Sequence, residues 1–157
     1  MALLFIPLLA FRAVPAMTAV SGVFTLTYVN QVATGTDAKG ASVFVSTGTG
    51  ANRNTGDSEY FSAGRVLAVD TAAMIEGNGT HSGQVTVSEG SDTVVERFTG
   101  ATTTRIVKGR PESTFEGTWT IISGTGRYSG ITGNGTYTGR FETATKSTVE
   151  WKGNTSR

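Results

Sequence analysis

Apolar and polar positions alternate most clearly between residues 115 and 141. Over residues 115–121, Phe, Gly, Trp and Ile at odd positions alternate with Glu and Thr at even positions. The same period returns over residues 135–142, where Tyr137 and Phe141 share one face. A period of two is typical of a strand with one inward and one outward face. The pattern therefore predicts two β-strands that follow each other along the chain.

A glycine-dense corner joins these two predicted strands. The segment Ser123–Gly135 contains five glycines in thirteen residues. Glycine tolerates positive φ angles, and glycines within strands allow two backbones to approach closely. We therefore expect a sharp corner at the rim of a barrel.

The same alternation predicts further strands along the rest of the chain. No stretch has a convincing helical period, and turn residues recur at short intervals, which is typical of an antiparallel barrel or a sandwich. Because closure removes exposed strand edges, we favour an all-β fold: a single small closed barrel of about eight strands. A polar loop is expected over residues 48–57. The additional predicted strands are Val23–Asn30, Ser42–Thr47, Arg65–Asp70, Gly77–Ser88, Val94–Phe98, Thr104–Lys108 and Thr148–Lys152.

One octapeptide pattern occurs twice. The segment GNGTHSGQ at residues 77–84 is echoed by GNGTYTGR at residues 133–140, which aligns His81 with Tyr137. Two copies are too few for a solenoid. They suggest two strands of one barrel that meet the same geometric requirement.

Composition limits the classes of function. With 157 residues and 38% apolar residues, the chain can bury the core of one domain. There is no cysteine, which excludes disulfides and thiolate chemistry. The net charge of +1 comes from scattered charges without a basic cluster, which argues against a nucleic-acid partner.

The N-terminal segment is the most apolar part of the chain. Residues 1–16 are too short to span a bilayer as a helix, and we separate them from a barrel domain at residues 17–157. Their length fits the apolar part of a signal peptide, but no basic residues precede it. The protein is secreted if this segment is cleaved, and cytoplasmic if translation starts at Met17. An ordered extension that packs on the barrel is the third alternative.

The C-terminal third resembles a known superfamily. The corner Gly124–Gly130, with the sequence GTGRYSG, together with the segments Phe115–Thr120 and Val149–Trp151, resembles the allene oxide cyclase-like barrels. These include plant allene oxide cyclases, dirigent proteins and bacterial spirotetronate cyclases. In the plant cyclases, a first-strand carboxylate and an asparagine two residues later hold the substrate and a water. The corresponding positions here are Tyr28 and Asn30; the carboxylate is absent, so that activity is not carried over.

Two ionisable residues are further catalytic candidates. His81 is the only histidine, which excludes a His-based metal site or a catalytic triad. It lies on an apolar strand face. There it either acts as a general acid or base inside the barrel or packs as an aromatic-like ring at the rim. Glu96 lies between Val94 and Phe98 on one face, where burial would raise its pKa towards neutrality. The alternative for Glu96 is a structural ion pair, for example with Arg97.

An inward aromatic set completes the candidate site. It can form a core or line a cavity, because a barrel of about eight strands is just wide enough for either. The glycines beside these rings favour a cavity. The four residues, which we expect to bind substrate, are Trp119, Tyr137, Phe141 and Trp151.

These observations lead to two functional hypotheses. The first is a cofactor-free barrel, without a metal, that binds an apolar small molecule and catalyses its cyclisation or isomerisation. The second is a non-catalytic binding or structural barrel that acts through its surface or its homo-oligomer. A cavity of roughly 300 Å³ or more lined by the candidate residues would favour the first hypothesis.

Overall fold

The computed structural model describes residues 16–58, 60 and 63–157. Residues 1–15, which make up nearly all of the predicted N-terminal segment, lie outside the described residues, so the domain division at residue 17 stays a prediction. A single turn of 3-10 helix, η1 (Gly126–Tyr128), accompanies the strands. The strands are β1 (Thr18–Thr36), β2 (Ser42–Asn54), β3 (Arg65–Ile75), β4 (Asn78–Glu89), β5 (Asp92–Val107), β6 (Arg110–Gly124), β7 (Thr132–Thr143) and β8 (Lys146–Ser156).

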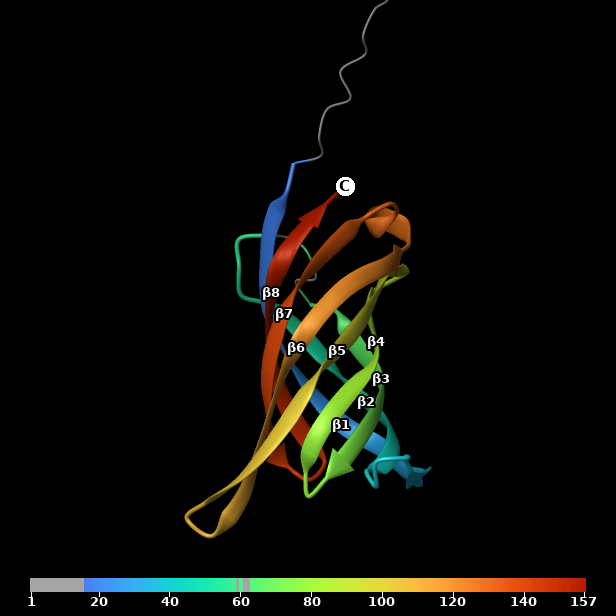
Figure 1. The fold of residues 1–157 in the computed structure, drawn as a ribbon. Coiled ribbons are helices and arrows are strands. Elements are labelled where there is room, and N and C mark those ends of the chain that lie inside the picture. Colours follow the sequence, from blue (N-terminus) through green and yellow to red (C-terminus); the bar gives the residue numbers. More distant parts are fainter. Residues whose placement is uncertain (1–15, 59, 61–62) are drawn as a thin grey trace, which may run out of the picture.

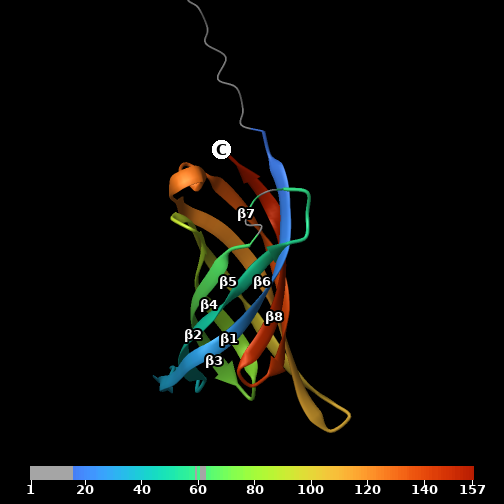
Figure 2. The same ribbon diagram turned by 180° about the vertical axis from the view of Figure 1, so that it is seen from behind.

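The eight strands form a closed antiparallel barrel. Each strand pairs with the next along the chain, and β8 pairs with β1 to close the sheet. Figures 1 and 2 show the C-terminus beside the start of β1 at one end, which we call the terminal end. The β5–β6 hairpin projects beyond the opposite end, the cavity end (Figure 1). The predicted all-β fold and barrel closure are confirmed.

The strands are longer than the sequence pattern predicted. The predicted loop over residues 48–57 is wrong over most of its length, because β2 continues to Asn54. Gly50 allows β2 to approach β1 so closely that a Cβ atom there would collide with the carbonyl oxygen of Thr25. Asn52 is buried and accepts a hydrogen bond of 2.8 Å from the indole Nε1 of Trp151. The polar composition of this segment pointed to a loop, but its buried Asn52 finds a hydrogen-bond partner in Trp151, far along the chain.

The predicted glycine corner between β6 and β7 is confirmed. Gly126 has a φ of +58°, and a Cβ atom at this position would also collide with the carboxylate of Asp92. The turn therefore needs glycine for both its backbone angle and its close approach to Asp92. Tyr128, in the same turn, is buried and donates a hydrogen bond of 3.0 Å to Oε2 of Glu89. The corner thus contacts Glu89 and Asp92, which lie at the terminal end of the barrel.

A hydrophobic core fills the terminal end of the barrel. Val94 is fully buried there, and the Tyr60 and Tyr128 rings meet edge to face with centroids 5.0 Å apart. None of the residues in this part of the core lines the large cavity described below. This packing separates the terminal end from the large cavity at the other end of the barrel. The core residues concerned are Val20, Val66, Val87, Val94, Tyr128 and Ile131.

Candidate functional site

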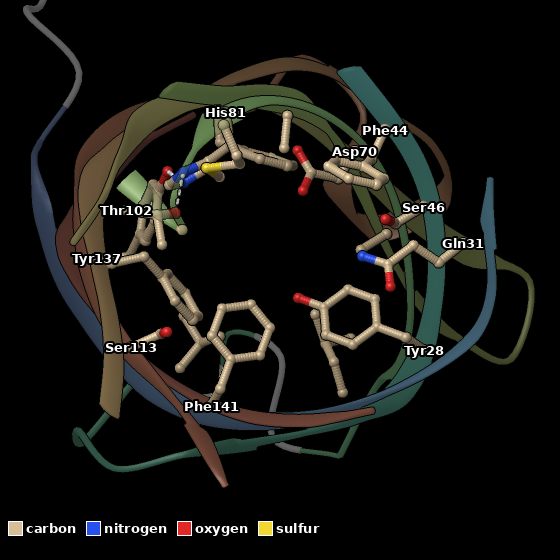
Figure 3. Close-up of a pocket in the computed structure, with 18 of the residues that line it drawn as sticks. Tyr28, Gln31, Phe44, Ser46, Asp70, His81, Thr102, Ser113, Tyr137 and Phe141 are labelled. Carbon is tan, nitrogen blue, oxygen red and sulfur yellow. Dashed lines mark hydrogen bonds between the residues drawn. The ribbon is translucent and has the colours of Figure 1, made fainter. Parts of the chain in front are cut away.

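A cavity of about 690 Å³ lies inside the barrel at the cavity end. All eight strands contribute lining residues, and Figure 3 looks into the space between them. This volume lies within the range of small-molecule sites and above the 300 Å³ or so that separates the two hypotheses. Its lining includes seven of the eight candidates from the sequence: Tyr28, His81, Glu96, Trp119, Tyr137, Phe141 and Trp151.

Asn30 does not line the cavity. The pairing of β1 with β2 shifts register between Tyr28 and Asn30, which makes Val29 an extra residue on β1. Asn30 consequently pairs with Thr47 on the outer face, while Gln31 lines the cavity instead. A bulge of this kind reverses the inward and outward faces of the strand beyond it. No pattern in the sequence indicates this bulge, so the resemblance to the plant cyclases pointed to Asn30, which the structure places outside the cavity.

His81 and Tyr137 form a hydrogen-bonded pair within the barrel wall. The distance between His81 Nε2 and Tyr137 Oη is 2.7 Å, and His81 Nδ1 lies 3.2 Å from Thr102 Oγ1. In the ladder, His81 pairs with Gly100, Gly100 with Gly117, and Gly117 with Tyr137. A Cβ atom on either glycine would collide with the Tyr137 hydroxyl. The two side chains therefore meet because the two strands between them carry no side chain in this row.

Burial determines the protonation state of this pair. Desolvation lowers the pKa of His81, so the imidazole is neutral near pH 7. Desolvation also raises the pKa of Tyr137, with a smaller contribution from the negative charge of Asp70. Both rings are thus uncharged hydrogen-bonding groups. The structure places His81 in a buried aromatic cluster with Phe98 and Phe115, whose ring centroids lie 6.0 and 5.8 Å away.

Glu96 lies deeper in the barrel than His81, on an inward position of β5. It pairs with Val85 of β4 and Ile121 of β6, and its remaining exposed surface faces the cavity that it lines. Desolvation raises the pKa of its carboxyl group to about 7. Arg97 points to the outer face and is exposed, and no salt bridge between described residues involves Glu96. Burial therefore brings this carboxyl group into the pH range in which it can exchange a proton near neutrality.

Asp70 is a second interior carboxyl group, which the sequence analysis did not select. It follows Val66 and Ala68 on the inward face of β3, and its carboxyl points into the cavity (Figure 3). Desolvation raises its pKa to about 6. The available signal was an aspartate in phase with buried aliphatic residues of a strand. The sequence analysis assigns Arg65–Asp70 to a strand but gives its last residue no role.

Aromatic rings form the opposite wall of the cavity. Tyr28 and Phe141 stack with ring centroids 5.9 Å apart, and Phe141 meets Phe115 edge to face at 5.3 Å. The Tyr28 hydroxyl points into the open space (Figure 3), 3.5 Å from Ser147 Oγ. Burial raises the pKa of Tyr28, so its hydroxyl is a neutral donor or acceptor. An apolar ligand in this space would contact ring faces and a few fixed polar groups.

The described residues contain no group of three or more His, Cys, Asp or Glu side chains placed to hold a metal ion. In the part of the chain that the structure describes, there is also no helix with the length and apolar character needed to cross a membrane. The polar groups of the cavity are instead dispersed among apolar side chains. This arrangement is suited to hydrogen bonding and proton transfer.

Comparisons with known proteins yield only distant structural likeness. No protein-family model matches the chain, and no curated protein matches it. The pterocarpan synthase dirigent protein GePTS1 has 13% sequence identity and a TM-score of 0.47, over 98% of this chain and 98% of that chain. The corresponding values for the pterocarpan synthase dirigent protein PsPTS1 are 14% and 0.46, over 90% and 96%. Likeness at this level carries no argument about chemistry, which rests here on the residues of the cavity.

Proposed function

We propose that this protein is a barrel of the allene oxide cyclase-like kind that holds an apolar small molecule in its cavity and promotes its cyclisation or isomerisation. The observation that carries the proposal is the cavity of about 690 Å³ with Glu96 inside it. A side-chain-filled barrel would leave no room for a substrate. A cavity of this size instead excludes water around a bound ligand and fixes its conformation.

Two carboxyl groups with displaced pKa values can move a proton without a cofactor. With a pKa of about 7, Glu96 is available as a protonated donor at neutral pH. With a pKa of about 6, Asp70 is largely ionised at the same pH and can accept a proton. An isomerisation that gains a proton at one atom and loses one at another can use one or both of these groups. In this proposal, Tyr28 and His81 orient polar groups of the substrate, and the aromatic residues fix its apolar body.

Native mass spectrometry of the protein purified from its own host tests the proposal. We expect an apolar compound that co-purifies with the folded protein and is released on unfolding. The variant Ala72→Trp, which places an indole in the cavity, should lose the compound. Ala101→Trp is the matched control, because Ala101 is exposed on an adjacent part of the barrel wall. An empty wild-type protein that also ignores a screen of apolar compounds would contradict the proposal.

One observation favours the second hypothesis, a barrel that acts through self-association. Aliphatic residues are exposed on the outer faces of β1 and β3: Val29 is 63% exposed, Val32 48%, Leu67 44% and Val69 45%. Exposed apolar surface of this kind is typical of interfaces. Light scattering of the purified protein decides whether a homo-oligomer forms. If it does, substitution of Val69 by Lys should weaken the association between subunits. A homo-oligomer is compatible with an occupied cavity.

A further inference from the structure

The charged groups that line the cavity are all acidic. Among the described lining residues there are four carboxyl groups and no lysine or arginine: Asp70, Glu76, Glu96 and Glu142. Of these, only Glu142 forms a salt bridge with a described residue, at 2.9 Å to Nε of Arg140 on the exposed rim. The remaining polar lining side chains, such as Gln31 and Ser46, are neutral. Among the described lining residues, the cavity therefore has negative charge without an internal counter-ion.

Asp70 has an unsatisfied acceptor inside this space. Its Oδ1 atom is buried and has no hydrogen-bond partner among the described residues. An ionised carboxylate only accepts hydrogen bonds, and a buried acceptor without a partner costs free energy. The carboxyl points into the cavity rather than into the wall (Figure 3). A positively charged group bound in the cavity beside this carboxylate would offset the cost of burying its charge.

The aromatic wall opposite Asp70 suits a ligand that carries its cation on an aromatic or aliphatic body. Tyr28, Phe141 and Phe115 form a continuous aromatic cluster: the ring centroid of Phe141 lies 5.9 Å from that of Tyr28 and 5.3 Å from that of Phe115. Ring faces attract positively charged nitrogen and pack against apolar groups. Figure 3 shows Tyr28 and Phe141 bordering the same open space as Asp70. A ligand can therefore contact the carboxylate with one end and the rings with the other.

We infer that the ligand of this cavity carries a positively charged amine on an apolar, ring-containing body, with the amine bound by Asp70. This inference rests on the proposed function, because it requires that the cavity holds a small molecule; with the amine at Asp70, proton transfer falls to Glu96. Glu76 and Glu142 at the cavity end would attract such a cation from solution. A ligand with a carboxylate or phosphate would instead meet like charge with no lysine or arginine among the described lining residues to offset it.

The inference can be tested with three probes that share one aromatic body. Isothermal titration calorimetry at about pH 8, above the pKa of both interior carboxyls and below that of an alkylamine, compares naphthylethylamine, naphthylethanol and naphthylacetate. We expect the amine to bind at least about tenfold more tightly than the alcohol, and the acid to bind most weakly. This order would follow from charge, because the apolar body is the same in all three probes.

Asp70→Asn isolates the contribution of the carboxylate. The amide is nearly the same size, so we expect the preference for the amine over the alcohol to fall to about twofold or less, with the alcohol still bound. Glu116→Gln, on an exposed outward position of β6, removes one negative charge outside the cavity and should preserve the preference. An unchanged preference in Asp70→Asn would overturn the assignment of Asp70.

The wild-type results separate failure of the inference from failure of the proposed function. If the alcohol binds as tightly as the amine, or the acid binds most tightly, the inference is wrong while the cavity remains a binding site. Both proposals are wrong if two results occur together. The first is that none of the three probes binds, and the second is that native mass spectrometry finds the same host compounds released from wild-type protein and from Ala72→Trp.

Discussion

The His81 imidazole and the Tyr137 phenol are hydrogen-bonded at 2.7 Å although two strands separate β4 from β7. Gly100 and Gly117 occupy the row between them. The repeated octapeptide in the sequence therefore contributes the two ends of one interaction. Gly100 and Gly117 come from other segments of the chain. The contact requires glycine at both positions, because a side chain there would collide with the Tyr137 hydroxyl.

Adding a methyl group at Gly100 should destabilise the barrel. A Cβ atom there would lie 2.5 Å from Tyr137 Oη and 2.9 Å from His81 Nε2, and would also collide with the Glu116 carbonyl oxygen. We expect Gly100→Ala to lower the free energy of unfolding by at least about 1–3 kcal/mol, the typical cost of overpacking. Urea unfolding measures the change.

Gly48→Ala is the matched control for this substitution. A Cβ atom at Gly48 would make only ordinary contacts, 3.5 and 3.6 Å from atoms of Tyr28 and Leu26. Its effect on the free energy of unfolding should stay within about 1 kcal/mol. Equal destabilisation by the two substitutions would show that the His81–Tyr137 row has no special steric requirement.

The pKa of His81 should be low and directly observable. Because it is the only histidine, its NMR signals are unambiguous, and we expect the folded protein to titrate below the ordinary value of about 6.5. The contribution of His81 to stability is then present above that value and is lost as the pH falls through the folded-state pKa. A titration at or above the ordinary value would contradict a neutral, buried imidazole.

Removing the Tyr137 hydroxyl should cost more stability than removing the Tyr28 hydroxyl. Tyr137→Phe leaves buried His81 Nε2 without its partner at 2.7 Å, and we expect a loss of about 1–3 kcal/mol in the free energy of unfolding. Tyr28→Phe is a control of identical chemistry, since the Tyr28 hydroxyl points into the cavity and lies 3.5 Å from Ser147 Oγ. The reverse order of losses would refute a structural role for the pair.

Glu96→Gln should make the empty protein more stable at alkaline pH. Because burial raises the pKa of Glu96 from 4.5 to about 7, the folded state favours the protonated carboxyl. Its stabilising contribution is complete below the unfolded pKa and is lost as the pH rises through the folded pKa, by up to roughly 3 kcal/mol. Thermal unfolding of wild type and variant should coincide at acidic pH and diverge above neutrality.

The pH dependence of this difference distinguishes burial from a general charge effect. Glu116→Gln removes an exposed carboxylate from the neighbouring strand β6 and should show no comparable divergence. If wild type and Glu96→Gln unfold at the same temperature across this pH range, the carboxyl is hydrated and cannot act as a protonated donor. Substrate release or turnover should also change in Glu96→Gln under the proposed function.

The alternation of residues determined the fold class and most of the interior. The period of two assigned Trp119, Tyr137 and Trp151 to the inward face, and the structure buries all three. The same period placed Glu96 inside, because it lies in phase with the inward residues Val94 and Phe98 of its strand. Local pattern is sufficient here because strand geometry fixes the direction of each side chain relative to its neighbours.

Tertiary structure alone decided which interior residues meet and where the register changes. The bulge at Val29 turned Asn30 outward and Gln31 inward, and strand pairing joined His81 to Tyr137 through a row of glycines. The cavity beside Asp70 depends on how all eight strands close around one axis. These features arise from contacts between segments distant in the chain, so the pattern within any one segment carries no record of them.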